Sequence, residues 1–588
     1  MLFVKSNKLR ILNLLFTIFT IFITSVWINF YYIATKNADF NKYYDYLNYF
    51  LGADVSISYG QGTLYYFIVA AVFKRNLVYI EENSLDLILS YSIQNTNLIF
   101  YLLGLYGIYK LFKLLNFDDN LIFLALSLFN FFPQSMLIRA VMKPEILAFS
   151  FFPWILYFAE KYRKDNNLIN VYFAFPFLLL IINSKGSIAG MAITYIVIAY
   201  FADIRKINPK KLVSLFLVFF SFLLLIQYEN YSITQNTLFD RDYDEKYDNR
   251  AEISSIYKLN FKTVFNSPYF YSESETDTSE NIHSDSVINS TILDSFGDFY
   301  NQFYDHDVNY FYENRKDIFR KTGDGLINSD REILYNGPFA DVLDKNLNII
   351  RKTLSSIFSV FFYSLLFRSI FKDKENRKFY IMPFIGVFIL YLNSLGFPSN
   401  NYNPILGDTY KTFYYSFLIS MAFLFVLLNI LKNYKILRVL IIIFWIPSIF
   451  FIAGHPKSIS QEFSEYLVTS NQYSAFCSVN NFIFFENPVI DLLHSSGNET
   501  KISTECNHPK INFPLTVDQK RNTEFCFDSS QISKKYSSMP ECRLVIIDFL
   551  LLNNEGKNVQ YPYVASVTLF LLILLAFKDI KFKTKRTS

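Results

Sequence analysis

Long apolar runs alternate with polar segments along most of the chain, and this pattern predicts a helical membrane protein. A run of about 20 mostly apolar residues crosses the hydrocarbon core of a bilayer as one helix. We identify about twelve such runs. They cover residues 11–33, 87–109, 121–138, 144–160, 168–184, 186–203, 212–228, 352–371, 379–397, 410–431, 438–454 and 562–577. The predicted fold class is therefore an all-α polytopic membrane protein.

One further apolar run, 63–73, is too short to span a membrane and ends at Lys74 and Arg75. We interpret it as an interfacial helix. The basic loops that follow residues 109, 160, 203, 371 and 431 then fall on the same side as both termini. The positive-inside rule assigns that side to the cytoplasm. Counting 63–73 as a span would place all of these charges outside.

This topology divides the chain into two membrane bundles and two large extracytoplasmic regions. The first bundle is 1–228, with seven spans and a first outer loop at 34–86; the second is 352–454, with four spans. The extracytoplasmic regions are 229–351 and 455–561, and 562–588 holds the last span and a basic tail. Both regions are rich in Ser, Asn, Asp and Tyr, which is typical of hydrated loops.

Composition and motifs exclude several function classes. The chain has 588 residues, 52% hydrophobic and 19% aromatic content, and a formal net charge of +4. There is no basic stripe interleaved with aromatic residues, so nucleic acid is not an expected partner. There is no phosphate-binding P-loop sequence and no glycine fingerprint for a dinucleotide, so we expect no nucleotide cofactor.

The four cysteines all lie in the last extracytoplasmic region, at Cys477, Cys506, Cys526 and Cys542. An even number confined to one translocated segment indicates one or two disulfides in an oxidising compartment. A zinc site is the alternative, but it requires closely spaced ligand pairs. The gaps here are 29, 20 and 16 residues. Three disulfide pairings remain open.

Charged residues gather at the outer ends of the predicted spans, and the cations among them run against the positive-inside rule. They are Asp39 and Asp45 after the first span; Arg139, Lys143 and Glu145 between the third and fourth; Lys185 between the fifth and sixth; and Asp408 and Lys411 at the start of the tenth. If the spans form a bundle, these ends converge on one outward cavity that suits an anionic lipid head group and a general base. Alternatively, each cation snorkels to lipid phosphates.

A second acidic cluster lies in the region 229–351. Asp294 and Asp298 would share one face of a helix. Carboxylate clusters suit hard divalent cations such as Mg²⁺ or Mn²⁺. A solvated acidic face is the alternative interpretation.

The first span, the acid-containing outer loop with its tyrosines, the glycine turn at Gly60 and Gly62, and the interfacial helix together resemble the C-type membrane glycosyltransferases. The segments R-A-V-M-K-P-E, starting at Arg139, and D-T-Y-K-T-F-Y-Y, starting at Asp408, extend the likeness. These enzymes use polyprenyl-phosphate sugars as donors, and their acceptors are glycans, lipids or proteins. In this chain Phe40 follows Asp39, where the family often has a second acid.

The resemblance implies a mechanism and assigns residues to it. Asp39 deprotonates the acceptor hydroxyl, with Asp45 in reserve, and Arg139, Lys143, Lys185 and Lys411 clamp the lipid phosphate. Glu145 and Asp408 complete the predicted substrate site. A divalent cation, Mg²⁺ or Mn²⁺, is a candidate cofactor, to which we assign no ligands, and the expected location is a bacterial cytoplasmic membrane.

Three alternative functions stay open at this point. A polysaccharide polymerase or ligase would use the same lipid-phosphate chemistry and rely on arginines in a large outer loop. The region 229–351 has such arginines, at Arg241, Arg250, Arg315, Arg320 and Arg331. A transporter or lipid flippase would require inverted repeats and charges near the middle of the membrane. The last alternative is a membrane scaffold.

Overall fold

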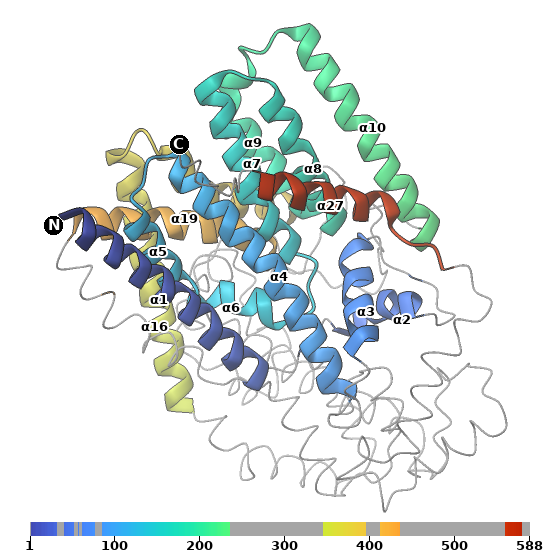
Figure 1. Ribbon diagram of the computed structural model, residues 1–588, viewed down its shortest axis with the longest axis horizontal. Helices are drawn as coiled ribbons and strands as arrows, with labels where there is room; N and C mark the ends of the chain where they lie inside the picture. The colour runs from blue at the N-terminus through green and yellow to red at the C-terminus, as the bar shows by residue number, and fades with distance from the viewer. Residues whose placement is uncertain are drawn as a thin grey trace, which may run out of the picture.

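A computed structural model shows an all-helical chain, as the apolar pattern predicted. It describes residues 2–31, 34, 40–51, 57, 61–76, 85–235, 345–394, 412–434, 441 and 559–578. The helices are α1 (Leu2–Tyr31), α2 (Phe40–Leu51), α3 (Leu64–Asn76), α4 (Leu85–Leu114), α5 (Asp119–Phe129), α6 (Pro133–Ala140), α7 (Ile146–Asp165), α8 (Ile169–Ser184), α9 (Gly186–Ile204), α10 (Pro209–Thr234), α16 (Lys345–Lys372), α17 (Arg377–Tyr380), α18 (Met382–Ser394), α19 (Thr412–Asn433) and α27 (Tyr563–Lys578). Figure 1 shows their arrangement.

Four helices of the described chain are long and apolar enough to cross a bilayer, which confirms a membrane-embedded helical protein. These candidate membrane spans are Lys8–Asn29, Gly186–Ile204, Pro209–Thr234 and Ser416–Asn433. The shorter apolar helices α8 and α27 coincide with two more predicted spans. The total of about twelve spans remains a prediction, because 438–454 lies almost wholly outside the described residues.

The predicted span 121–138 is a pair of helices, α5 and α6, bent by 62°. Proline explains the break. Pro133 occupies the first turn of α6, and Phe132 before it is extended, with φ −66° and ψ 127°. A proline ring clashes with a helical conformation at the preceding residue, so α5 cannot continue through this point.

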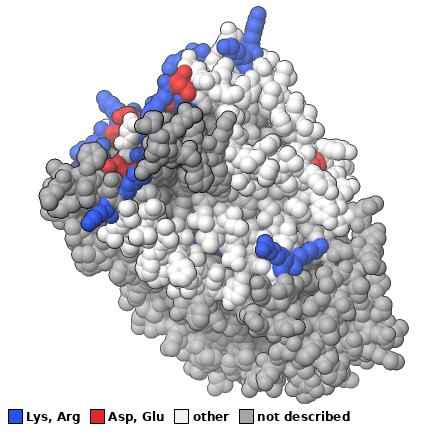
Figure 2. Space-filling view, in the orientation of Figure 1, with Lys and Arg blue, Asp and Glu red and all other residues white. Residues whose placement is uncertain are grey.

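The basic helix ends lie together at one end of the molecule. Arg10 at the start of α1 and Lys113 at the end of α4 both pair with Asp119 of α5, at 3.1 and 2.9 Å. The Lys164 ammonium at the end of α7 donates to the Leu114 carbonyl oxygen. Figure 2 shows most of the visible Lys and Arg side chains along one edge, at the upper left, beside a broad uncharged surface. This arrangement agrees with helices that alternate in direction.

Helix α7 carries both polar sites described below, and two glycines of α4 bring it close. A Cβ atom at Gly104 would lie 3.1 Å from the Ser150 Cα atom, and one at Gly107 would lie 2.8 Å from the Trp154 Nε1 atom. Small residues let membrane helices approach in this way. The Trp154 Nε1–H group then donates to the Leu103 carbonyl oxygen at 3.0 Å.

Helices α2 and α3 lie in the region predicted as the first outer loop and pack against each other (Figure 1). Helix α3 has 13 residues, so it is about 20 Å long and too short for a full crossing. It also contacts α4 and α8. The two helices therefore form a short layer against the ends of longer ones.

Candidate functional site

Glu145 and Lys185 meet where two helix junctions come together. Glu145 is the residue before α7, and Lys185 separates α8 from α9. The Lys185 Nζ atom lies 3.9 Å from the Glu145 Oε1 atom. Glu145 is only 1% exposed, and neither of its carboxylate oxygens accepts a hydrogen bond. The sequence analysis placed these two residues in one cavity, and the structure brings them together.

Lys143 is also buried, at 1% exposure, so it does not extend to the surface. Its Nζ atom lies 5.6 Å from the centre of the Tyr43 ring, within the range of a cation–π contact. The backbone before it is held by Asn97, whose Nδ2 atom donates to the carbonyl oxygens of Arg139 and Val141 at 3.1 and 2.8 Å. The connection between α6 and α7 is therefore fixed by α4.

Tyrosines from α2 and α3 form one wall of the site. The rings of Tyr46 and Tyr66 stack with centroids 4.4 Å apart, and Tyr43 lies 5.6 Å from Tyr66. The Tyr66 hydroxyl donates to the Gln61 Oε1 atom at 2.8 Å, and the Tyr46 hydroxyl accepts from the Gln61 backbone N–H at 2.7 Å. These contacts fold the glycine turn back onto the two helices.

The phenols nearest the site are held in the neutral form. Burial raises the pKa of Tyr65, and the charge of Glu145 adds a smaller increase. Burial likewise raises the pKa of Tyr66, with Tyr43, Tyr46 and Glu145 acting in the same direction. The Tyr65 hydroxyl donates to the Asn97 Oδ1 atom at 2.8 Å. These tyrosines therefore provide hydrogen-bond donors and ring surface rather than bases.

Gly62 allows the turn before α3 to rest directly on the end of α8. A Cβ atom at this position would lie 1.1 Å from the Asn183 carbonyl oxygen and 2.6 Å from its Oδ1 atom. The Leu64 backbone N–H donates to the same Oδ1 atom at 3.3 Å. Asn183 is two residues before Lys185, so this contact ties the first outer loop to the Lys185 junction.

Arg139 is deeply buried, at 2% exposure, and is engaged inside the helix bundle. Its Nε, Nη1 and Nη2 groups donate to the Ser135 carbonyl oxygen, the Thr24 hydroxyl and the Asn130 carbonyl oxygen, at 2.9, 3.0 and 3.0 Å. Its guanidinium carbon lies 4.5 Å from the centre of the Tyr101 ring. The contact with Asn130 satisfies a carbonyl group at the α5–α6 break. Together these contacts favour a structural role for Arg139. Its expected contact with the lipid phosphate remains a prediction.

The other predicted residues cannot be placed in the site. Asp45 belongs to α2, but its side chain is outside the described part of the structure. The same holds for the whole of Asp39, Asp294, Asp298, Asp408, Lys411, Cys477, Cys506, Cys526 and Cys542. Among the described residues, no three His, Cys, Asp or Glu side chains lie close enough to hold a metal ion. The roles predicted for the undescribed residues, including the divalent cation, therefore remain predictions.

Sequence reasoning missed most of the residues that build this site. A helix over 40–51 places Tyr43, Tyr46, Leu47 and Phe50 on one face, and all four are buried. The spacing of these four residues is that of one helix face and could have been recognised in the sequence. No sequence signal pointed to Asn183 or Asn97, because their partners are 119 and at least 32 residues away.

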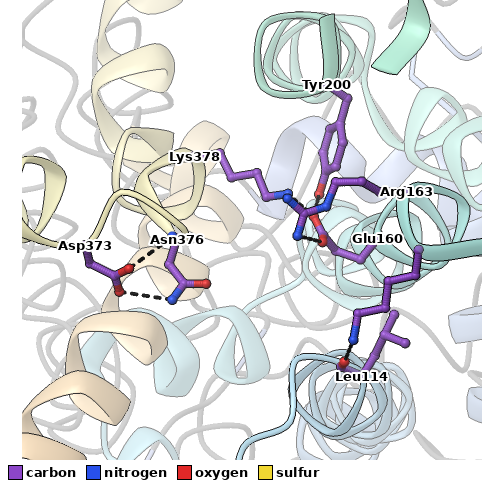
Figure 3. A network of polar contacts seen from close by, with 8 residues as sticks. Leu114, Glu160, Arg163, Tyr200, Asp373, Asn376 and Lys378 are labelled. Carbon is purple, nitrogen blue, oxygen red and sulfur yellow. Dashed lines mark hydrogen bonds and ion pairs between the residues drawn. The ribbon is translucent and has the colours of Figure 1, made fainter. Parts of the chain in front are cut away.

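A second buried carboxylate, Glu160, lies near the other end of α7. Figure 3 shows its carboxylate surrounded by Tyr200, Arg163 and Lys378. The Tyr200 hydroxyl donates to its Oε1 atom at 2.7 Å, and the Lys378 ammonium donates to the same oxygen. The Arg163 Nη2 atom forms an ion pair with Oε2 at 2.9 Å. Burial lowers the pKa of the Lys378 ammonium, and Glu160 opposes that shift.

This Glu160 cluster joins three helices that are far apart in sequence. Lys378 belongs to α17, and its carbonyl oxygen accepts a hydrogen bond from the Tyr195 hydroxyl of α9 at 3.1 Å. Every charged group in the cluster has a partner within the chain, and together these contacts connect α7, α9 and α17.

Comparison of the chain with protein families, with curated proteins and with solved structures found no match.

Proposed function

We propose that this protein is a glycosyltransferase that transfers a sugar from a polyprenyl-phosphate carrier to an acceptor on the extracytoplasmic side of a membrane. The observation that carries the proposal is the convergence of Lys143, Glu145 and Lys185 beneath the tyrosines of α2 and α3. One buried lysine, Lys143, one partly exposed lysine, Lys185, and a wall of neutral phenols suit a phosphate head group. Preorganised cations away from water stabilise the charge that develops on a leaving phosphate.

In this reaction the lysines and the first outer loop have separate tasks. Lys143 and Lys185 bind the carrier phosphate and stabilise it as the glycosidic bond breaks. Asp39 is proposed to accept the proton of the attacking hydroxyl, with Asp45 as the reserve base. A general base contributes a factor on the order of 10²–10⁴ in rate. Asp408 and Lys411 are proposed to complete the substrate site, with Mg²⁺ or Mn²⁺ as a possible cofactor class.

The orientation follows from charge. The Glu145 end of α7 is opposite the basic end, where Lys164 and Arg163 lie. If that basic end faces the cytoplasm, the candidate site opens on the trans side, where polyprenyl-linked sugars are used by the family that this chain resembles. We propose a bacterial cytoplasmic membrane as the location, with both termini in the cytoplasm.

A broken helix is also typical of transporters, in which freed backbone groups bind the transported ion. At the α5–α6 break these groups are already occupied. The carbonyl oxygens of Phe129 and Phe132 accept from the backbone N–H groups of Phe132 and Met136 at 2.8 and 3.1 Å, and the Ser135 hydroxyl lies within reach of both. The Asn130 carbonyl oxygen accepts from Arg139. This observation supports a structural break and favours the transferase over a transporter.

The test is sugar transfer in isolated membranes supplied with labelled polyprenyl-phosphate sugars. We expect transfer by the wild type and a loss on the order of 10²–10⁴ in the Asp39→Asn variant, with expression and membrane insertion unchanged. Asp203→Asn is the matched control, because Asp203 forms a surface pair with Lys206 at the basic end. Wild-type turnover by Asp39→Asn would remove Asp39 from the mechanism. Use of preassembled oligosaccharide donors alone would favour a polymerase or ligase.

A further inference from the structure

Glu145 is the one group of the candidate site to which the proposed reaction gives no task. Its carboxylate is 1% exposed and accepts no hydrogen bond. The Lys185 Nζ atom, at 3.9 Å, is beyond hydrogen-bond distance. A buried charged group without a hydrogen bond is strongly unfavourable, so an unsatisfied one in a native structure needs an explanation.

The spacing of the pair indicates what fits between its members. An oxygen atom about 2.8 Å from the carboxylate and about 2.8 Å from the ammonium can bridge atoms 3.9 Å apart. The carboxylate only accepts hydrogen bonds and the ammonium only donates them. The bridging group must therefore donate on one side and accept on the other, and a hydroxyl group does both.

The surroundings disfavour a charged group in the same place. A cation would lie close to the Lys185 ammonium, and an anion would be repelled by the Glu145 carboxylate. Tyr65 and Tyr66 are neutral for the reasons given above. A neutral hydroxyl of a sugar or polyol gives Glu145 the donor that it lacks and accepts from the Lys185 ammonium, without adding charge.

We infer that Glu145 and Lys185 together bind a hydroxyl group of a substrate, with Glu145 accepting its hydrogen and Lys185 donating to its oxygen. The assignment to a substrate rests on the proposed function. An ammonium has three N–H donors, so Lys185 can hold this hydroxyl and a phosphate at once. The hydroxyl then belongs either to the sugar of the donor or to the acceptor, and both sources present the same chemistry to Glu145.

Binding measurements with three probes separate the sources. The probes are polyprenyl phosphate, polyprenyl-phosphate mannose, and octyl glucoside, which has sugar hydroxyls but no phosphate. The variants are Glu145→Gln, which keeps the shape and removes the charge, and Glu145→Asp, which keeps the charge. Loss of a hydrogen bond to a charged group weakens binding by about 10–100-fold.

If the hydroxyl belongs to the donor sugar, Glu145→Gln binds polyprenyl-phosphate mannose about 10–100-fold more weakly, while binding of polyprenyl phosphate does not fall. If it belongs to the acceptor, both affinities are kept and the rate of transfer falls by the same factor. In either case Glu145→Asp recovers part of the loss. Unchanged binding and unchanged transfer, within about twofold, would overturn the inference.

Thermal unfolding with octyl glucoside tests the hydroxyl site independently of the transferase proposal. The glycoside is added to protein in a detergent without sugar groups. We expect it to raise the apparent melting temperature of the wild type and of a Glu160→Gln control, but not of Glu145→Gln. If the wild type binds no polyprenyl phosphate or its mannoside, the proposed function fails and this measurement still decides the inference. Equal stabilisation of the wild type and Glu145→Gln would then overturn it.

Discussion

A glutamate is buried at each end of α7, and the two carboxylates differ in the partners that surround them. Glu160 is 0% exposed and is contacted by a lysine, an arginine and a tyrosine of the same chain. Glu145 is 1% exposed, accepts no hydrogen bond, and has an ion pair only at 3.9 Å. Burial is therefore the same at both ends, and only the completeness of the partners differs.

This difference separates a structural ion cluster from a candidate binding site. A buried ion pair stabilises a fold only when its geometry is good and its remaining hydrogen-bonding groups are satisfied. The Glu160 cluster comes closer to that condition. Its Oε1 atom accepts hydrogen bonds from Tyr200 and Lys378, and its Oε2 atom, which accepts no hydrogen bond, lies 2.9 Å from the Arg163 Nη2 atom. Neither oxygen of Glu145 accepts a hydrogen bond, so no hydrogen bond offsets the cost of its burial.

The largest expected effect comes from removing each carboxylate in turn. Glu160→Ala leaves Lys378 and Arg163 without their acid, and breaking a buried pair in this way destabilises a protein by about 3–5 kcal/mol. Glu145→Ala removes a group that lacks hydrogen bonds, so we expect no loss of stability. The measurement is the apparent melting temperature of each purified variant in detergent. Equal losses would show that the two ends do not differ in the way described.

The next prediction concerns the backbone of the candidate site. Gly62→Ala forces a Cβ atom against the Asn183 carbonyl oxygen, where only 1.1 Å is available. We expect destabilisation of about 3 kcal/mol, the upper part of the usual range for overpacking, and loss of sugar transfer. Gly190→Ala is the matched control, because no atom lies within 4 Å of its added Cβ. Wild-type transfer by Gly62→Ala would mean that the turn before α3 does not shape the site.

The ends of several helices could be predicted from the sequence, because a hydrophobic run stops there and a polar or basic segment begins. The runs predicted at 168–184 and 186–203 are the helices Ile169–Ser184 and Gly186–Ile204. The sequence analysis expected Lys185 and Glu145 to converge if the spans form a bundle, because both lie at predicted outer span ends. Their charged groups lie 3.9 Å apart in the structure.

The interior contacts were not readable, for physical reasons. The partners of Arg139 come from α1, α4, α6 and the α5–α6 break. No sequence pattern distinguishes burial, snorkelling and ligand binding for that arginine. Glu160 and Lys378 are 218 residues apart. The positive-inside rule counts Lys378 only as one more charge of a solvated loop. Hydropathy reports which residues leave water, but not which polar groups find each other.

A third prediction tests Lys185, the cation of the Glu145–Lys185 pair. Lys185→Gln removes a charge-assisted hydrogen bond, which contributes about 1.5–3 kcal/mol. Binding of polyprenyl phosphate should therefore weaken by about 10–100-fold. Lys206→Gln is the control, because Lys206 is a surface residue at the basic end whose ion pair contributes about 0–1 kcal/mol. If both variants bind the lipid equally well, Lys185 does not contact the phosphate.

The smallest expected effect comes from removing one tyrosine hydroxyl near each of the two glutamate sites. Tyr66 and Tyr195 are both 0% exposed, and each hydroxyl donates to a neutral acceptor. The Tyr66 hydroxyl donates to Gln61 Oε1 at 2.8 Å, and the Tyr195 hydroxyl donates to the Lys378 carbonyl oxygen at 3.1 Å. Replacing either by Phe should lower stability by about 1 kcal/mol and keep the ring packing. Only Tyr66→Phe should also slow sugar transfer, because Gln61 and the glycine turn form the wall beside Lys143 and Glu145. The comparison requires melting temperatures and transfer rates for both variants. A slower rate in Tyr195→Phe alone would place the rate-controlling contacts at the Glu160 end of α7.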